Sequence, residues 1–329
     1  MLVTGGAGFI GSALVWALNR RGRDDIVVAD RLGTDDRWRN LSALRFEDYV
    51  EADDLLPRLT AGALGAFDLV LHMGACSSTT ERDASFLARN NFEYTKDLAR
   101  WAIAKRVRFV YASSAATYGD GSAGMSDADD SPDGLARLRP LNAYGYSKQL
   151  FDQHAARTGL LSTIVGLKYF NVFGPNEAHK GDMRSLVDKA FGQVRDSGRV
   201  RLFKSHRPDY KHGEQQRDFL YVKDAVAMTL HLAESPRAHG LYNIGSGAAS
   251  TWLELTNALF AAIGKKPAID FIDMPESIRD KYQYFTQADI AKLRASGYRA
   301  AVTPLRDAVA DYVRGYLVPD RRLGDEPAA

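Results

Sequence analysis

A tyrosine and a lysine stand four residues apart in the stretch Tyr144-Gly145-Tyr146-Ser147-Lys148. On a helix, this spacing places both side chains on one face. A phenol with a pKa near 10 is a poor base at neutral pH. Lowering that pKa by about two or three units takes roughly 3–4 kcal/mol of preferential phenolate stabilisation. A neighbouring ammonium supplies part of it, so the pair predicts a proton-accepting tyrosine, although the same spacing also arises by chance on helix surfaces.

A glycine-rich turn, Thr4-Gly5-Gly6-Ala7-Gly8-Phe9-Ile10-Gly11, follows an apolar strand over residues 1–4 and precedes a helical pattern. This order is typical of a dinucleotide-binding loop. Gly5 permits the tight turn, Gly8 lets the backbone approach a pyrophosphate, and Gly11 lets the helix lie close to the strand. The helix N-terminus favours the anion. The candidate cofactor contacts of this loop are Gly5, Gly8, Phe9, Ile10 and Gly11.

The residues after the second strand, over 26–29, bear on which dinucleotide binds. Asp30 stands about 20 positions after the glycines, where an acidic residue usually binds the adenosine ribose and indicates NAD. Arg31 and Arg37 follow it, and two guanidiniums could hold a 2′-phosphate. The two signals point in opposite directions. We favour NADP, with NAD as the alternative.

The composition limits the classes of protein to which this chain can belong. The chain has 329 residues, 45% of them hydrophobic and 26% charged, as in ordinary globular proteins. Its net charge of +2 gives no general attraction to nucleic acid or membranes. Cys76 is the single cysteine, so we expect no intrachain disulfide and no metal site. Neither a membrane span nor a signal peptide is expected, which favours a cytoplasmic location.

Short apolar strands alternate with helical patterns through the first half of the chain, and this predicts a doubly wound parallel α/β sheet of the Rossmann type. A strand over 67–72 leads into small residues that let a cofactor pass over its carboxyl end. A helix is expected over 143–157. Further candidate cofactor contacts are Met73, Gly74, Ala75, Cys76, Ser77 and Asn90.

The regular alternation of strands and helices ends after Tyr169, where loops lengthen and the elements become short and mixed. We expect a dinucleotide-binding domain over 1–169 and a smaller mixed α/β substrate domain over 170–318. Residues 217–234 are expected to return to the edge of the main sheet. A polar loop is expected over 204–216, and a disordered tail over 319–329.

The glycine loop, Ser114 and Tyr144-x-x-x-Lys148 together resemble the extended short-chain dehydrogenase/reductase family of nucleotide-sugar epimerases and dehydratases. The resemblance implies that Tyr144 takes a sugar hydroxyl proton while hydride leaves the same carbon, that Ser114 hydrogen-bonds the oxygen, and that Lys148 binds the nicotinamide ribose. Alanines at 115 and 116 stand where dehydratases need a carboxylic acid. Epimerisation or simple oxidation is therefore favoured.

Longer motifs, such as residues 74–81, 111–119, 169–175 and 285–289, are similar to the members of this family that invert C6″ of an ADP-heptose for the lipopolysaccharide inner core. The resemblance makes Lys180 a second acid/base residue and a cofactor contact, with Val172 as another. A second base suits an inversion, because hydride returns to the opposite face of the carbonyl. The substrate contacts it implies are Ser114, Asn171, Asp182, Lys189, Phe203, Lys204, Ser205, His206, Arg217 and Tyr282.

Two of these positions depart from the pattern. Asp182 stands where a small hydroxyl residue is expected, and a carboxylate near a diphosphate is unfavourable unless it is paired. Lys189 replaces a histidine and suits an anionic substrate. The loop over 204–216 is also longer than expected. These changes allow a different heptose nucleotide and leave the chemistry alone.

Other functions share part of this pattern. A UDP-sugar 4-epimerase or related decarboxylase would share Ser114, Tyr144 and Lys148 but would not need Lys180. A non-catalytic NADP-sensing protein on the same fold usually loses the tyrosine, which is present here. Nucleic-acid binding lacks a basic stripe with interleaved aromatic residues. The resemblance also implies a homo-oligomer, a pentamer.

Overall fold

Seven short runs of mostly apolar residues form one sheet in the computed structural model, which describes residues 1–279 and 282–325. In spatial order the strands are β11 (Gly240–Ile244), β6 (Val165–Tyr169), β5 (Arg108–Ser114), β4 (Leu69–His72), β1 (Leu2–Thr4), β2 (Val27–Asp30) and β3 (Asp48–Glu51). All neighbouring strands are parallel. The predicted parallel α/β fold is confirmed.

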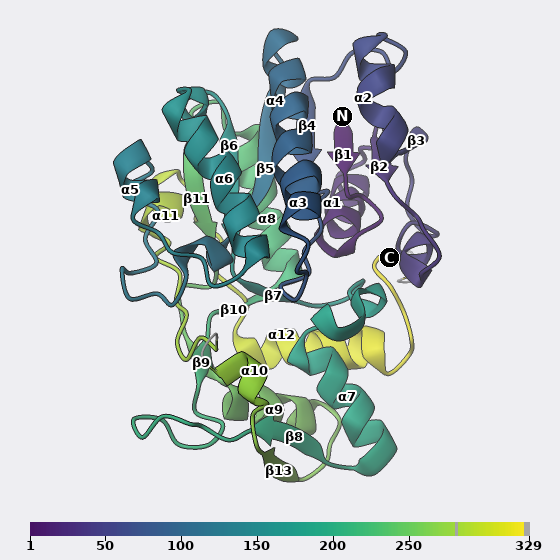
Figure 1. Ribbon diagram of the computed structural model, residues 1–329. Coiled ribbons are helices and arrows are strands. Elements are labelled where there is room, and N and C mark those ends of the chain that lie inside the picture. Colours follow the sequence, from purple (N-terminus) through teal and green to yellow (C-terminus); the bar gives the residue numbers. More distant parts are fainter. Residues whose placement is uncertain (280–281, 326–329) are drawn as a thin grey trace.

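Helices cover both faces of the sheet, because alternate side chains of each strand point to opposite sides. One face packs against α1 (Phe9–Arg20) and α8 (Val222–Glu234). The other packs against α2 (Ala52–Thr60), α4 (Tyr94–Ala104) and α6 (Ala143–Arg157). Figure 1 shows α4 and α6 in front of the sheet and α8 behind it. The bounds of α6 are those predicted for the helix that carries Tyr144 and Lys148.

Short elements connect this layered part. They are the 3-10 helices η1 (Asp36–Asn40), η3 (Ala115–Tyr118) and η4 (Leu160–Ser162), the helices α3 (Ala84–Leu87), α5 (Pro132–Ala136) and α11 (Ala291–Ala295), and the π-helical turn η2 (Ala88–Glu93). The turn η2 joins α3 to α4 without a break.

The remaining elements gather beyond the carboxyl ends of the main strands (Figure 1). Their helices are α7 (Leu186–Ser197), α9 (Trp252–Ala262), α10 (Glu276–Arg279), α12 (Leu305–Tyr312), the 3-10 helix η5 (Ala178–Met183) and the π-helical turn η6 (Val313–Leu317). Their strands form three two-stranded sheets: β7 (Asn171–Phe173) with β10 (Phe219–Tyr221), β9 (Gln216–Arg217) with β12 (Ser250–Thr251), and β8 (Val200–Phe203) with β13 (Ile269–Ile272). Residues 204–215, predicted as a loop, contain neither helix nor strand.

The strand expected at the sheet edge near residue 218 lies elsewhere, so that prediction was wrong. β10 pairs with β7 in a separate small sheet, and the edge of the main sheet is taken by β11. The helix that follows, α8, does return to the main sheet and packs on it beside α1. β10 and β11 are both short apolar runs, and their pairing depends on distant partners. The division into domains at residue 170 stays a prediction.

The chain end is ordered as far as it is described, so the predicted disorder was wrong for residues 319–325. Leu323 is fully buried, and its backbone N–H donates to the side chain of Asn176 at 3.0 Å. Gly324 lies against Ala43 and Leu44. One buried leucine fixes this segment to the sheet domain although its composition is polar. Residues 326–329 lie outside the described part.

Within the described residues, every helix is too short or too polar to cross a bilayer.

Replacing Leu323 with alanine should lower the free energy of unfolding by about 2–5 kcal/mol, because it empties a buried site. Denaturant unfolding of Leu323→Ala and of the control Arg321→Ala, whose side chain is exposed, measures this. Equal stability of the two variants would show that the segment is not anchored.

Candidate active site

A large cavity lies where the main strands end, and residues that follow β1, β4, β5 and β6 line it. Its volume is about 1380 Å³. Single ligands commonly occupy roughly 300–1,000 Å³, so this cavity has room for a dinucleotide and a second ligand. The position is the usual ligand edge of an open parallel sheet.

The glycine turn at one end of the cavity is built by close backbone contacts. A Cβ on Gly11 would lie 2.0 Å from the carbonyl oxygen of Gly5, so any side chain there would push α1 away from the turn. Gly5 has φ +65° and lies against Gly74, where a Cβ would be 2.6 Å from the Gly74 nitrogen. These contacts leave the N-terminus of α1 open to the cavity, as a pyrophosphate requires. The turn therefore fits a dinucleotide.

Asp30 holds this turn together. Its Oδ2 accepts hydrogen bonds from the backbone N–H of Ala7 at 2.9 Å and of Gly8 at 3.1 Å. Burial raises the pKa of Asp30, and the N–H of Arg31 and the charge of Arg37 oppose that rise. Asp30 thus braces the glycine turn through Oδ2, and its contact with a ribose stays a prediction.

The two arginines after β2 line the cavity and are paired with acidic side chains. Arg31 forms an ion pair with Asp53 at 2.5 Å and donates to Asn90 Oδ1 at 3.0 Å. Arg37 pairs with Asp35 at 2.7 Å. Both guanidiniums are partly exposed, so a phosphate could share them.

Tyr144, Ser114 and Lys148 meet because α6 begins beside the end of β5. Asn142 caps the helix by accepting the N–H of Gly145 at 2.8 Å. A Cβ on Gly145 would lie 2.8 Å from the carbonyl of Ala116, so the helix packs directly on η3, which follows Ser114. One turn further, the Lys148 Nζ donates to the Ala112 carbonyl at 2.8 Å. The three predicted residues line one wall.

Burial acts on both ionisable members of this group. It raises the pKa of Tyr144, and the Ser114 hydroxyl offsets part of the rise. It lowers the pKa of Lys148 to about 8, and the charge of Asp152 limits that fall. Lys148 is therefore an ammonium at neutral pH. The phenolate needs positive charge, and Lys148 is placed to supply some.

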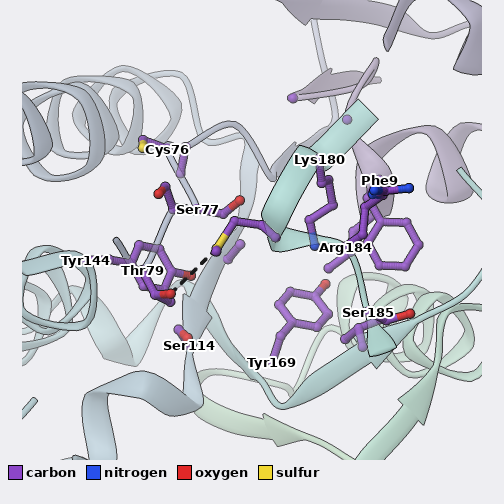
Figure 2. A pocket seen from close by; sticks show the side chains of 18 of the residues that line it. Phe9, Cys76, Ser77, Thr79, Ser114, Tyr144, Tyr169, Lys180, Arg184 and Ser185 are labelled. Carbon is purple, nitrogen blue, oxygen red and sulfur yellow. Dashed lines mark hydrogen bonds between the residues drawn. The ribbon is translucent and has the colours of Figure 1, made fainter. Parts of the chain in front are cut away.

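Lys180 enters the cavity from the side opposite Tyr144 (Figure 2). It is carried by η5, and its Nζ lies 5.1 Å from the centre of the Phe9 ring. Burial lowers the pKa of Lys180; the charge of Glu177 opposes this and that of Lys189 adds to it. Within the described part of the chain the Lys180 amine forms neither a hydrogen bond nor an ion pair, so it is free to meet a ligand.

Arg217 is buried behind the cavity wall. Its guanidinium lies between the rings of Trp252 and Tyr282, 5.8 and 5.1 Å from their centres, and donates to the carbonyls of Gln216 and Gln283. Burial lowers the pKa of Arg217. It has no carboxylate partner among residues 1–279 and 282–325. The Tyr282 hydroxyl accepts from the Trp252 indole N–H at 2.9 Å.

The structure brings most of the other predicted residues to the same cavity. All predicted cofactor contacts line it, from Gly5 and Phe9 to Asn90 and Val172. The predicted substrate contacts that line it are Ser114, Asn171, Lys189, Phe203 and Tyr282.

Five predicted substrate contacts do not line the cavity: Asp182, Lys204, Ser205, His206 and Arg217. The Asp182 side chain is exposed, and its carbonyl accepts from Lys189 at 3.3 Å. Lys204 pairs with Asp273 at 3.1 Å. The backbone of His206 donates to the Tyr284 hydroxyl at 2.9 Å. Their roles stay predictions.

Two buried asparagines that sequence reasoning missed organise the site. Asn40 donates to the carbonyls of Ala7 and Asn176, which ties the glycine turn to the segment before Lys180. Asn91, in η2, bonds both backbone groups of Cys76, at 2.9 Å each. No motif marks either residue, because each acts through partners that are distant in sequence.

A metal centre is not formed by the described residues, since no three His, Cys, Asp or Glu side chains in them are arranged to hold an ion.

Known proteins are similar to this chain in sequence and in fold. The sequence model of the NAD dependent epimerase/dehydratase family matches residues 1–245. The chain is 52% identical over 317 residues to an ADP-L-glycero-D-manno-heptose-6-epimerase of Nitratidesulfovibrio vulgaris, covering 96% of this chain and 97% of that one. It is similar to the Helicobacter pylori ADP-L-glycero-D-manno-heptose-6-epimerase structure, with a TM-score of 0.80 and 26% identity over 95% and 94% of the chains. It is also similar to UDP-glucuronic acid 4-epimerase of Bacillus cereus in complex with NAD, with a TM-score of 0.75 and 25% identity over 95% and 98% of the chains. The chain therefore belongs to the NAD dependent epimerase/dehydratase family.

Proposed function

We propose that this protein inverts C6″ of ADP-D-glycero-D-manno-heptose to give the L-glycero epimer, using NADP, for lipopolysaccharide inner-core synthesis. The observation that carries the proposal is the placement of Tyr144 and Lys180 on opposite sides of one cavity. The names of the relatives in Nitratidesulfovibrio vulgaris and Helicobacter pylori support the substrate.

Proton transfer at the sugar oxygen is the work of this chain's residues. Bound dinucleotide would accept hydride from C6″ and return it, which makes the reaction redox-neutral. Tyr144 takes the hydroxyl proton of one epimer, and Ser114 hydrogen-bonds the oxygen. Lys148 holds positive charge beside the phenol. After the keto sugar rotates to present its opposite face, Lys180 delivers a proton to the oxygen of the second epimer.

A base on each side is the physical requirement of this inversion. Hydride must reach the opposite face of the same carbonyl, so the sugar oxygen points away from its first partner. A single base on one wall would serve one epimer. Burial lowers the pKa of Lys180 from its usual value, which is the direction that suits a group that both gives and takes a proton.

Buried positive charge supports an anionic substrate. Arg217 lacks a carboxylate partner among the described residues, and Lys189 adds a second cation at the cavity. Burying an unpaired charge is costly, and a diphosphate would offset that cost. In this proposal Arg217 contacts the diphosphate after Tyr282 shifts off it.

NADP is proposed over NAD for two reasons. The Oδ2 of Asp30 is occupied by two N–H groups of the glycine turn, which leaves only Oδ1, already bonded to the Arg31 N–H, for a ribose hydroxyl. Arg31 and Arg37 line the same end of the cavity. Against this stands the bound NAD of the Bacillus cereus structure. The cytoplasmic location and the pentameric assembly stay predictions.

Incubation of the protein with ADP-D-glycero-D-manno-heptose, followed by NMR of the C6″ epimers, tests the reaction. Formation of the L-glycero epimer without added reductant is expected. Turnover of a UDP-hexose in its place would favour the alternative, a UDP-sugar 4-epimerase, and would remove the role of Lys180.

Tyr144→Phe should retain the cofactor and lose turnover by about 100-fold or more, the usual worth of a positioned acid/base group. Cofactor absorbance and the epimerisation rate measure the two effects. Tyr146→Phe is the matched control, because Tyr146 is 53% exposed two residues further along the same helix. A fully active Tyr144→Phe would remove this tyrosine from the mechanism.

Lys180→Met should impair interconversion by about 100-fold or more while changing ADP-sugar affinity much less. Rates and calorimetric binding are compared with those of Lys105→Met, which replaces an exposed lysine. If rate and affinity fall together, Lys180 is a binding residue and not a base.

Arg31→Ala combined with Arg37→Ala should weaken NADP binding about tenfold or more beyond any loss for NAD, because charged hydrogen bonds to the 2′-phosphate disappear. Titration with both dinucleotides gives the ratio. Arg39→Ala is the control, since Arg39 shares η1 with Arg37 but does not line the cavity. An unchanged ratio would overturn the choice of NADP.

A further inference from the structure

A buried carboxylate lies behind Lys180, and the mechanism above does not use it. Glu177 is fully buried. Its Oε1 accepts from the Gly174 N–H at 3.2 Å and the Ser185 hydroxyl at 2.6 Å, and its Oε2 accepts from the Ser185 N–H at 2.5 Å. All three groups donate to it, which favours the ionised form, whereas burial raises the pKa of Glu177.

These bonds close the segment that carries Lys180. Gly174 precedes the segment and Ser185 follows it, so Glu177 joins its two ends. The 3-10 helix η5 between them is short and broken at Gly181, whose φ is +53°. Such a turn is weakly held by its own hydrogen bonds. The Lys180 N–H also donates to the Glu177 carbonyl at 3.0 Å.

We propose that Glu177 is a positioning residue for Lys180, closing the 174–185 segment so that the amine faces the cavity. The inference rests on the proposed function, in which Lys180 is the second acid/base group. It assigns a role to a buried acid that never touches the substrate.

The charges around Lys180 act on its pKa in opposite directions. Burial and the Lys189 cation on α7 favour the neutral amine, whereas Glu177 favours the ammonium. The charge of Lys180 lowers the pKa of Glu177, and the charge of Asp188 on α7 raises it. Tyr312 of α12 faces both acids. Asp188 is paired with Arg184 at 2.7 Å. Glu177 is thus the acidic group whose charge opposes the fall in the pKa of Lys180.

An NMR titration of ¹³C-methylated lysines tests the charge coupling directly. The Lys180 resonance is assigned by its absence in Lys180→Met. In Glu177→Gln it should titrate at a pH lower by about one unit or more, because an opposite charge has been removed. Ser185→Ala removes the hydroxyl that donates to Glu177 and that caps α7 at the Asp188 N–H, but it keeps the charge of Glu177, so its Lys180 resonance should titrate as in the unchanged protein. An unshifted titration in Glu177→Gln would overturn the proposal.

Kinetics test the positioning. Both Glu177→Gln and Ser185→Ala should lower kcat several-fold with a smaller change in KM, because the loop is loosened and the binding groups remain. If Glu177→Gln does not fold, an unchanged kcat in Ser185→Ala overturns the positioning role. A fully active Lys180→Met would instead sink the acid/base role of Lys180, and the NMR titration would still report on the coupling.

Discussion

Three basic side chains of the site, two buried and one half-buried, have no carboxylate in hydrogen-bonding contact among the described residues, and the rest of the site depends on this unbalanced charge. Lys148 and Arg217 donate to backbone carbonyls, and Lys180 lies over the Phe9 ring. Burial lowers the pKa of all three. An unpaired buried charge costs several kcal/mol, roughly, and an anionic ligand offsets it. The same desolvation brings the two lysines toward the pKa range in which acid/base catalysis works.

The buried charges that stabilise the fold are paired, whereas those proposed to act in the chemistry are not. Asp152 lies two turns after Tyr144 on α6 and forms a fully buried ion pair with Lys168 at 2.8 Å. It also accepts from Tyr111 and Ser113. This cluster neutralises itself and fixes α6 against β5. Because the helix is held by a paired charge, the unpaired Lys148 one turn away can be tuned by burial without loosening the wall.

The parts of the site that sequence predicted are those fixed by local spacing. Gly5 and Gly11 act within one turn, and Tyr144 and Lys148 act within one helix, so residue order alone brings them together. The parts that it missed depend on contacts between distant segments. Asn40 reaches Asn176, and Leu323 packs beside the same residue. Asp30 was predicted at the cavity and lies there, but its hydrogen bonds to the glycine turn were not predicted, because a motif does not show which backbone groups a side chain will bind.

The predicted substrate contacts that do not line the cavity lie on different elements from the residues proposed for proton transfer. Asp182 and residues 204–206 lie on η5 and an irregular loop, whereas Ser114 and Tyr144 are fixed by β5 and α6. The Asp182 carboxylate is exposed and does not line the cavity, and its effect on a diphosphate stays a prediction. Changes of sequence or length in these two segments can alter the fit of the sugar while the proton-transfer groups stay in place. In the proposed function, the departures from the family pattern therefore bear on which heptose nucleotide is accepted, and the inversion depends on the two walls that carry Tyr144 and Lys180.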